Sequence, residues 1–286
     1  MTVTARTDAS APADAKACCA MAYESEAVRW LLGESFHPGG LELTGRLGHL
    51  LDLGPGRRLL DVACGQGASI LHLAEQWGCQ AVGVDLSARN IEAAQAVAVA
   101  RGLGSLVRFE VGDAERLPFE AASFDAVLCE CALCLFPDKA AAADEMARVL
   151  APGGRVGVSD VVRSGELPGG LSGIESYIAC IADARPLEAW AALFGGAGIQ
   201  AEVVERRDAA LVQLADEVRR RLFSAEVLVG LGKLNWPEVD FRTANRLAAE
   251  VVAAIRAGRL GYGVFTGRAV QAAEARRQRA VANESP

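Results

Sequence analysis

The chain has 286 residues, 51% of them hydrophobic, and carries a formal net charge of -7. A chain of this length and apolar content can bury one large core and needs no division into two domains. The negative charge argues against nucleic acid as the main substrate, and no apolar run approaches the roughly 20 residues that cross a membrane.

Residues 1–16 are small, polar and rich in alanine, and they lack the apolar block of a secretory signal. We therefore expect a flexible lead-in at 1–16 and a cytoplasmic protein. The chain also contains eight cysteines. In a reducing compartment these cysteines are better explained as free thiols, reactive or ligating, than as a disulfide framework.

Two helices are expected ahead of the first strand. Apolar residues with helical spacing occupy 24–32 and 41–51, and the sequence Phe-His-Pro-Gly-Gly at 36–40 separates them as a loop. These helices would form a cover over the site that the following strands build.

Beyond residue 57, apolar runs of strand length alternate with helical patterns, which predicts a parallel sheet with helices on both faces. The strands are expected near 58–63, 80–84, 106–111, 124–129 and 155–160, and the helices near 68–77, 88–101, 138–150 and 186–197. The sequence Leu-Ala-Pro-Gly-Gly at 150–154 is expected to end a helix before the fifth strand. A sixth strand is expected at 201–206 and a last strand at 262–267.

Between these last two strands, 209–258 is too long for a plain hairpin connection and is interpreted as two or three helices. The predicted fold class is α/β: a Rossmann-like, seven-stranded, mostly parallel sheet with helices on both faces and an antiparallel last strand. We expect a single domain over 17–286, made of the helical cover (17–52), a core (57–206), a helical insertion (207–260) and the last strand (261–268).

The most informative pattern is Leu-Leu-Asp-Val-Ala-Cys-Gly-Gln-Gly at 59–67. An apolar run containing Asp61 turns on Gly65 and Gly67 into a helical pattern, which is typical of a cradle for a nucleotide-like cofactor. Glycine permits the unusual dihedral angles and the close approach of a ligand that such a turn needs. The next apolar run ends in Asp85, about 20 residues after Gly65, where an acid can bind ribose hydroxyls.

A dinucleotide-binding motif would carry a third glycine where this chain has Ile70, and no Lys-Ser/Thr pair follows the glycines. A ligand without phosphates therefore fits this turn better. Together with Asp85 and the sequence Gly-Asp-Ala at 112–114, the turn resembles that of the class I S-adenosylmethionine-dependent methyltransferases.

This resemblance implies S-adenosylmethionine as cofactor and methyl donor. It places the methionine part at the glycine turn, the ribose at Asp85 and the adenine near Asp113. The cofactor-binding residues that it implies are Asp61, Ala63, Gly65, Gly67, Asp85, Leu86, Asp113, Ala114 and Glu130.

The cysteines lie in segments that can converge above one edge of the sheet. Cys131 and Cys134 follow the fourth strand, and open α/β sheets bind ligands beyond the carboxyl ends of their strands. The pair at 18–19 precedes the first covering helix, and Cys180 follows the fifth strand. Three thiolates from such segments would make a soft, trigonal site for a thiophilic ion.

The other cysteines, Cys64, Cys79 and Cys129, fall in or beside apolar runs and are interpreted as packing residues. The Cys-x-Cys-x-x-Cys spacing of residues 129–134 matches no known zinc-ribbon or zinc-finger pair, and no pair of histidines accompanies it.

Residues 130–139, Glu-Cys-Ala-Leu-Cys-Leu-Phe-Pro-Asp-Lys, are similar to the Asn-Cys-Val-x-Asn-Leu-Ser-Pro-Asp-Lys stretch of arsenite methyltransferases. Residues 177–184 are similar to the Cys-x-x-Gly-Ala segment of that family, and Cys18 and Cys19 stand where it has its N-terminal substrate cysteine. Glu130 departs from the family's Asn. The resemblance implies that Cys131, Cys180 and either Cys18 or Cys19 are catalytic and hold trivalent arsenic as substrate.

The partners implied are arsenite or a thiol-conjugated arsenite and a cellular thiol reductant, without nucleic acid or membrane, and we expect a monomer. Arsenic held by three sulfurs keeps a lone pair that can attack the methyl group without a general base. Two alternatives stay open. One is an O-, N- or C-methyltransferase of small molecules, in which the cysteines only pack and Glu130, Tyr23 or His37 acts as base. The other is a non-catalytic thiol-based binder of soft metals.

Overall fold

The computed structural model describes residues 37–166, 183–236 and 239–270, together with Ala27, Trp30, Leu31, Gly33 and Ile181. The expected helix at 24–32 and the lead-in therefore lie largely outside the described residues. No helix in the described part of the chain is both long enough and apolar enough to cross a membrane.

Seven strands form one sheet in the order β3-β2-β1-β4-β5-β7-β6, which confirms the predicted fold class. The strands are β1 (Arg58–Val62), β2 (Gln80–Asp85), β3 (Val107–Val111), β4 (Phe124–Glu130), β5 (Leu150–Arg163), β6 (Ile199–Arg206) and β7 (Leu260–Ala269). The neighbours of β7 pair with it in antiparallel register, and the other pairs are parallel. β7 is thus the antiparallel strand that the sequence predicts.

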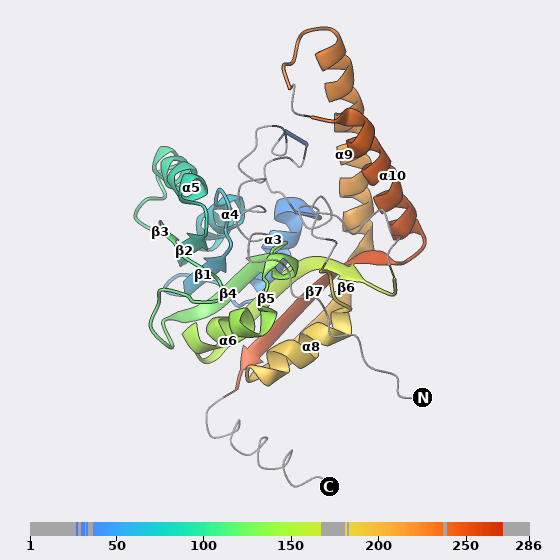
Figure 1. Cartoon of the computed structure of the whole chain (residues 1–286). Helices are drawn as coiled ribbons and strands as arrows, with labels where there is room; N and C mark the ends of the chain where they lie inside the picture. The colour runs from blue at the N-terminus through green and yellow to red at the C-terminus, as the bar shows by residue number, and fades with distance from the viewer. Residues whose placement is uncertain are drawn as a thin grey trace, which may run out of the picture.

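Helices cover both faces of the sheet (Figure 1). α3 (Gly40–Leu50), α4 (Ala68–Trp77) and α5 (Ala88–Ala100) contribute to one core cluster, as do α9 (Asp208–Gly230) and α10 (Phe241–Arg256). α6 (Lys139–Val149) and α8 (Leu187–Gly196) contribute to the other cluster. Because successive strand residues point to opposite faces, Leu59 belongs to the first cluster and Leu60 to the second.

The two helices of the 209–258 segment, α9 and α10, lie side by side and extend from the end of the sheet that carries β6 and β7 (Figure 1). They contact the core through a few buried residues, among them Leu211 and Ile255. The number of helices lies within the two or three that the sequence predicts.

The fifth strand is longer at both ends than its apolar run. It begins at Leu150, which pairs with Phe124, whereas the sequence predicted a strand from about 155 and the end of a helix over 150–154. The register of this pair of strands shifts between Phe124 and Ala126, and this irregularity accommodates the Pro-Gly-Gly sequence within the strand. At the other end β5 continues to Arg163, because its last residues pair with the start of β7.

Candidate active site

The turn after β1 has the backbone conformation that the glycines predict. Ala63, Gly65 and Gly67 have φ angles of 60°, 54° and 81°, and the turn is held by a hydrogen bond from the Gly67 amide to the Cys64 carbonyl. A Cβ atom at Gly65 would have no heavy atom within 4 Å. The backbone is therefore open at this point to a ligand, and the non-glycine Ala63 stores strain in the turn, as residues of functional sites often do.

Gly67 serves a different purpose from Gly65. A Cβ atom at Gly67 would lie 2.7 Å from Cζ of Phe109 on β3 and 3.2 Å from Cβ of Ala94 on α5. Only glycine therefore lets α4 begin this close to its neighbours, which fixes the start of the helix beside the turn.

Asp61, on β1, is 2% exposed, and its Oδ2 atom has no hydrogen-bond partner among the residues that the structure describes. Burial, and then the negative charges of Glu130 and Asp85, raise the pKa of Asp61 well above its usual range. Leaving a buried carboxyl oxygen without a partner costs free energy, so this atom is suited to a cationic or hydrogen-bond-donating ligand.

Asp85 ends β2 beside the same turn. Its Oδ2 accepts a hydrogen bond of 2.9 Å from the Gly65 amide, and its Oδ1 accepts one of 2.9 Å from the Ser87 amide. The Asp85 carbonyl accepts a hydrogen bond from the Gly112 amide, which brings Asp113 to the same edge of the sheet. Leu86, next to Asp85, exposes 40% of its surface and offers an apolar contact.

These observations fit S-adenosylmethionine, whose sulfonium and ammonium groups are positive. The site offers a buried Asp61 oxygen without a described partner, open space above Gly65 and an acid at the end of β2, and all three lie at one edge of the sheet. The chain brings the acidic residues together because parallel strands end at one edge of the sheet.

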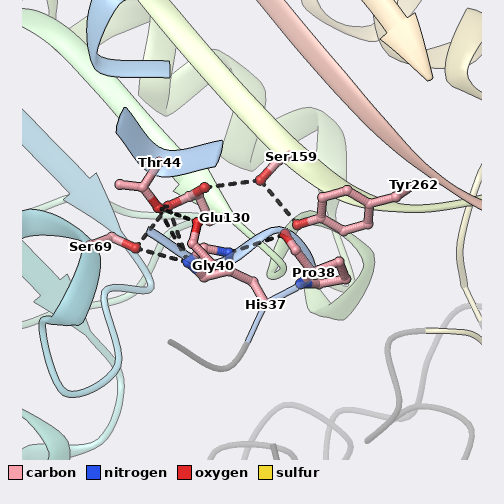
Figure 2. A network of polar contacts seen from close by, with 8 residues as sticks. All are labelled: His37, Pro38, Gly40, Thr44, Ser69, Glu130, Ser159 and Tyr262. Atoms are coloured by element: carbon pink, nitrogen blue, oxygen red, sulfur yellow. Dashed lines mark hydrogen bonds and ion pairs between the residues drawn. The ribbon is translucent and has the colours of Figure 1, made fainter. Parts of the chain in front are cut away.

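Glu130, at the end of β4, is the centre of a buried polar network (Figure 2). Thr44 and Ser69 donate hydrogen bonds of 2.9 and 2.7 Å to its Oε2 atom, and Ser159 donates one of 3.2 Å to Oε1. Tyr262 in turn donates a hydrogen bond of 3.1 Å to the Ser159 hydroxyl. Both oxygens of the Glu130 carboxyl group thus have hydroxyl donors, so its orientation is fixed.

His37 completes this network from the loop before α3. Its Nε2 atom lies 3.6 Å from Oε2 of Glu130, and both side chains are only 4% exposed. The same nitrogen lies 3.2 Å from the Ser69 hydroxyl, and Nδ1 lies 3.4 Å from the Pro38 carbonyl oxygen. The imidazole therefore lies beside the Glu130 carboxyl group, in a geometry that suits a proton acceptor.

Of the predicted arsenic-binding cysteines, the structure describes Cys131 alone; Cys18, Cys19 and Cys180, like the candidate base Tyr23, lie outside the described residues. Cys131 directly follows Glu130, has a φ of 53° and donates its amide to the Ser159 carbonyl. Among the described residues no group of three His, Cys, Asp or Glu side chains could hold a metal ion.

The cysteines that were interpreted as packing residues all belong to the two core clusters or pack against them. Cys79 and Cys129 are fully buried, and burial raises the pKa of the Cys79 thiol to about 11. Burial, followed by the charges of Asp61 and Asp85, also raises the pKa of Cys64 well above its usual range. Cys64 and Cys79 therefore stay protonated at neutral pH and are poor nucleophiles.

Sequence reasoning missed the four hydroxyl residues of the network, Thr44, Ser69, Ser159 and Tyr262. Ser69 could have been found, because it is the second residue of the helix that follows the glycine turn. Tyr262 carries no such signal, since its distance from Glu130 depends on the antiparallel placement of β7 between β5 and β6.

Comparison with known proteins relates the chain to methyltransferases. A family described as a methyltransferase domain matches residues 60–158. Nocamycin O-methyltransferase of Saccharothrix syringae is 35% identical over 229 residues, which cover 72% of this chain and 80% of that protein. Methyltransferase GfsG of Streptomyces halstedii is 34% identical over 149 residues, which cover 52% of this chain and 54% of GfsG, so the chain spans about half the length of that relative.

Among solved structures, phosphoethanolamine N-methyltransferase 2 of Haemonchus contortus, in complex with phosphomonomethylethanolamine and S-adenosylhomocysteine, superposes with a TM-score of 0.72. The match is 22% identical and covers 88% of this chain and 58% of that one. This similarity is one of fold.

Proposed function

Because this chain belongs to the class I S-adenosylmethionine-dependent methyltransferases, whose methyl donor is S-adenosylmethionine, we propose that it methylates an oxygen or nitrogen atom of a small organic molecule. The observation that carries this proposal is the buried pair of Glu130 and His37, 3.6 Å apart at the carboxyl edge of the sheet. Oxygen and nitrogen acceptors lose a proton on methylation, and this pair is equipped to take it up.

We assign the methyl donor to the edge formed by β1, β2 and β3. Gly65 and Gly67 shape the space for its methionine part, and the free oxygen of Asp61 faces its positive charge. In this assignment Asp85 and Leu86 contact the ribose, and Asp113 and Ala114 lie near the adenine. Ala63 and Glu130 complete this set of cofactor-binding residues from the ends of β1 and β4.

When bound, S-adenosylmethionine supplies an electrophilic methyl group on a positively charged sulfur. The chain itself orients the acceptor and removes its proton. We place the proton at Nε2 of His37, where the Glu130 carboxylate stabilises the resulting imidazolium. Aligning two reactants in one site contributes up to roughly 7–11 kcal/mol, and a positioned proton acceptor adds about 10²- to 10⁴-fold in rate.

Support for an organic acceptor comes from the relative of which the chain covers 80%, nocamycin O-methyltransferase. Methyl transfer to oxygen needs a proton acceptor, and the described site contains one.

Methylation of trivalent arsenic is a second candidate, favoured by the position of Cys131. This thiol directly follows Glu130 and is partly exposed, so it stands beside the proposed methyl donor. The remaining thiolates of this alternative are Cys180 and one of Cys18 and Cys19. It differs from the first candidate in needing no proton acceptor.

The two candidates are separated by offering the purified protein S-adenosylmethionine with a labelled methyl group. One set of reactions contains a panel of phenols, alcohols and amines, and a parallel set contains arsenite with glutathione. Mass spectrometry identifies the methylated products. We expect label in an organic acceptor, a loss of about 10²-fold in kcat for His37→Ala, and full activity for Cys131→Ser.

Methylated arsenic in the wild type that disappears in Cys131→Ser, with His37→Ala unaffected, would replace the first candidate by the second. A protein that binds arsenite and methylates nothing in either set would instead be a thiol-based binder of soft metals.

A further inference from the structure

We propose that Tyr262 and Ser159 are positioning residues that hold Glu130 as a fixed carboxylate toward the positive charge of the methyl donor, so that the site prefers S-adenosylmethionine over S-adenosylhomocysteine. The inference rests on the proposed function, because it takes the methyl donor to lie at this edge of the sheet. The proposed site then includes residues of β5 and β7, which are remote from the glycine turn in the sequence.

The two hydroxyl groups come from neighbouring antiparallel strands. Val161 of β5 pairs with Tyr262 of β7, so Ser159 and Tyr262 stand two residues apart in register. Tyr262 and Ser159 are both fully buried. The Tyr262 hydroxyl donates 3.1 Å to Ser159, which donates 3.2 Å to Oε1 of Glu130, as Figure 2 shows.

The direction of these hydrogen bonds follows from the charges around Tyr262. Burial, followed by Cys131, Glu130 and Asp160, raises the pKa of Tyr262 well above its usual range. The phenol therefore keeps its proton and acts as a donor to Ser159. Because the Ser159 oxygen accepts the hydrogen bond from Tyr262, the Ser159 hydroxyl donates its own hydrogen to Glu130.

On the opposite side of the carboxylate, Thr44 and Ser69 occupy Oε2. The Glu130 carboxylate thus has donors on both oxygens and a fixed orientation.

A carboxylate held in this way makes the affinity of the site depend on the charge of the ligand. Asp85 adds negative charge to this site, because together with Glu130 it raises the pKa of the buried Asp61. The sulfonium group of S-adenosylmethionine is positively charged and is attracted by these acids. The sulfur atom of S-adenosylhomocysteine, the product of methyl transfer, is a neutral thioether. The network thereby favours binding of the methyl donor and release of the used cofactor.

The test is the ratio of the dissociation constants for S-adenosylhomocysteine and S-adenosylmethionine, measured by titration calorimetry on the full chain. Loss of a hydrogen bond in a charged network should lower this ratio by about threefold in Tyr262→Phe and by about tenfold in Ser159→Ala. Ser159→Thr keeps the hydroxyl and should restore most of the preference. Phe265→Leu, a change on the opposite face of β7, lowers stability and should leave the ratio unchanged.

An unchanged ratio in folded Tyr262→Phe and Ser159→Ala would overturn the inference. Glu130→Gln distinguishes this failure from failure of the proposed site. If Glu130→Gln lowers the ratio and the hydroxyl variants do not, only the positioning role proposed for Tyr262 and Ser159 is wrong. If Glu130→Gln also leaves the ratio unchanged, Glu130 does not face the methyl donor, and the proposed site falls together with the inference. If Tyr262→Phe does not fold, the comparison of Ser159→Ala with Ser159→Thr decides.

Discussion

At the scale of single residues, Asp61 has an environment unlike that of a surface acid. It is buried, one of its oxygens has no described partner, and two other carboxylates lie near it. Acids with such strongly raised pKa values are concentrated at the binding and catalytic sites of proteins. The position of Asp61 beside the open backbone of Gly65 indicates a role in the binding of a cation.

The raised pKa of Asp61 has a consequence for the ligand-free protein. Between the usual pKa near 3.8 and the higher value in the folded state, the folded protein holds a proton that the unfolded chain has lost. This contribution to stability is present at low pH and disappears as the pH rises through the folded pKa.

Asp61→Asn removes this contribution, because asparagine does not titrate. We expect the variant to gain stability relative to the wild type as the pH rises from about 4 toward neutrality, and to bind S-adenosylmethionine more weakly. Thermal unfolding of both proteins without ligand, at several pH values, measures the effect. Two curves of melting temperature against pH that run parallel would contradict it.

The residues of the site differ in how far the sequence could identify them. Asp61 and Asp85 can be identified from the sequence, because Asp61 lies within an apolar run and Asp85 ends one. Both runs predict strands, and the pattern places the two acids at one edge of a sheet. Thr44, Ser159 and Tyr262 act through contacts across 86 and 103 positions of the chain. Such contacts depend on the packing of whole elements, and no local spacing predicts them.

At the scale of elements, the sequence predicts the positions of the short strands β1 to β4 well, but it does not predict the two ends of β5. The apolar runs predict β1, β2 and β4, which are buried along most of their length, and β3, which lies at the edge of the sheet and is only partly buried. The extent of β5 is instead determined by its partners. Leu150 pairs with β4 and Arg163 with β7, and neither partner can be read from the Pro-Gly-Gly sequence itself.

The start of α4 offers a test of how tightly this element is packed. Gly67 and Gly56 have the same φ of 81°, but a Cβ atom would meet Phe109 at 2.7 Å in the first case and nothing within 4 Å in the second. Gly56→Ala should cost about 1–2 kcal/mol for the left-handed backbone. Gly67→Ala should cost a further 1–3 kcal/mol, roughly, for overpacking.

Urea unfolding of the two variants gives the comparison directly, because the backbone cost is shared and cancels. Equal losses of stability would mean that α4 can move away from β3 and α5 without cost. The glycine would then be required for its backbone conformation alone.

At the scale of the whole molecule, the strand order brings the parts of the site together. β1 and β4 are neighbours in the sheet, although two strands and two helices separate them in the sequence. Their carboxyl ends place the glycine turn beside Glu130, and β5 and β7 bring the Ser159 and Tyr262 hydroxyls from the other half of the sheet (Figures 1 and 2). The net charge of -7 is thus accompanied by a cluster of acids at the edge where a cation is expected.

A calorimetric titration of S-adenosylmethionine into the wild type and Asp85→Ala tests most directly whether this edge of the sheet holds S-adenosylmethionine. The control is Asp144→Ala, which removes an exposed acid of α6. We predict one binding site per chain, an affinity at least about tenfold weaker in Asp85→Ala, since charge-assisted hydrogen bonds to the ribose are lost, and no change in the control. Equal affinity of the wild type and a folded Asp85→Ala would contradict the account.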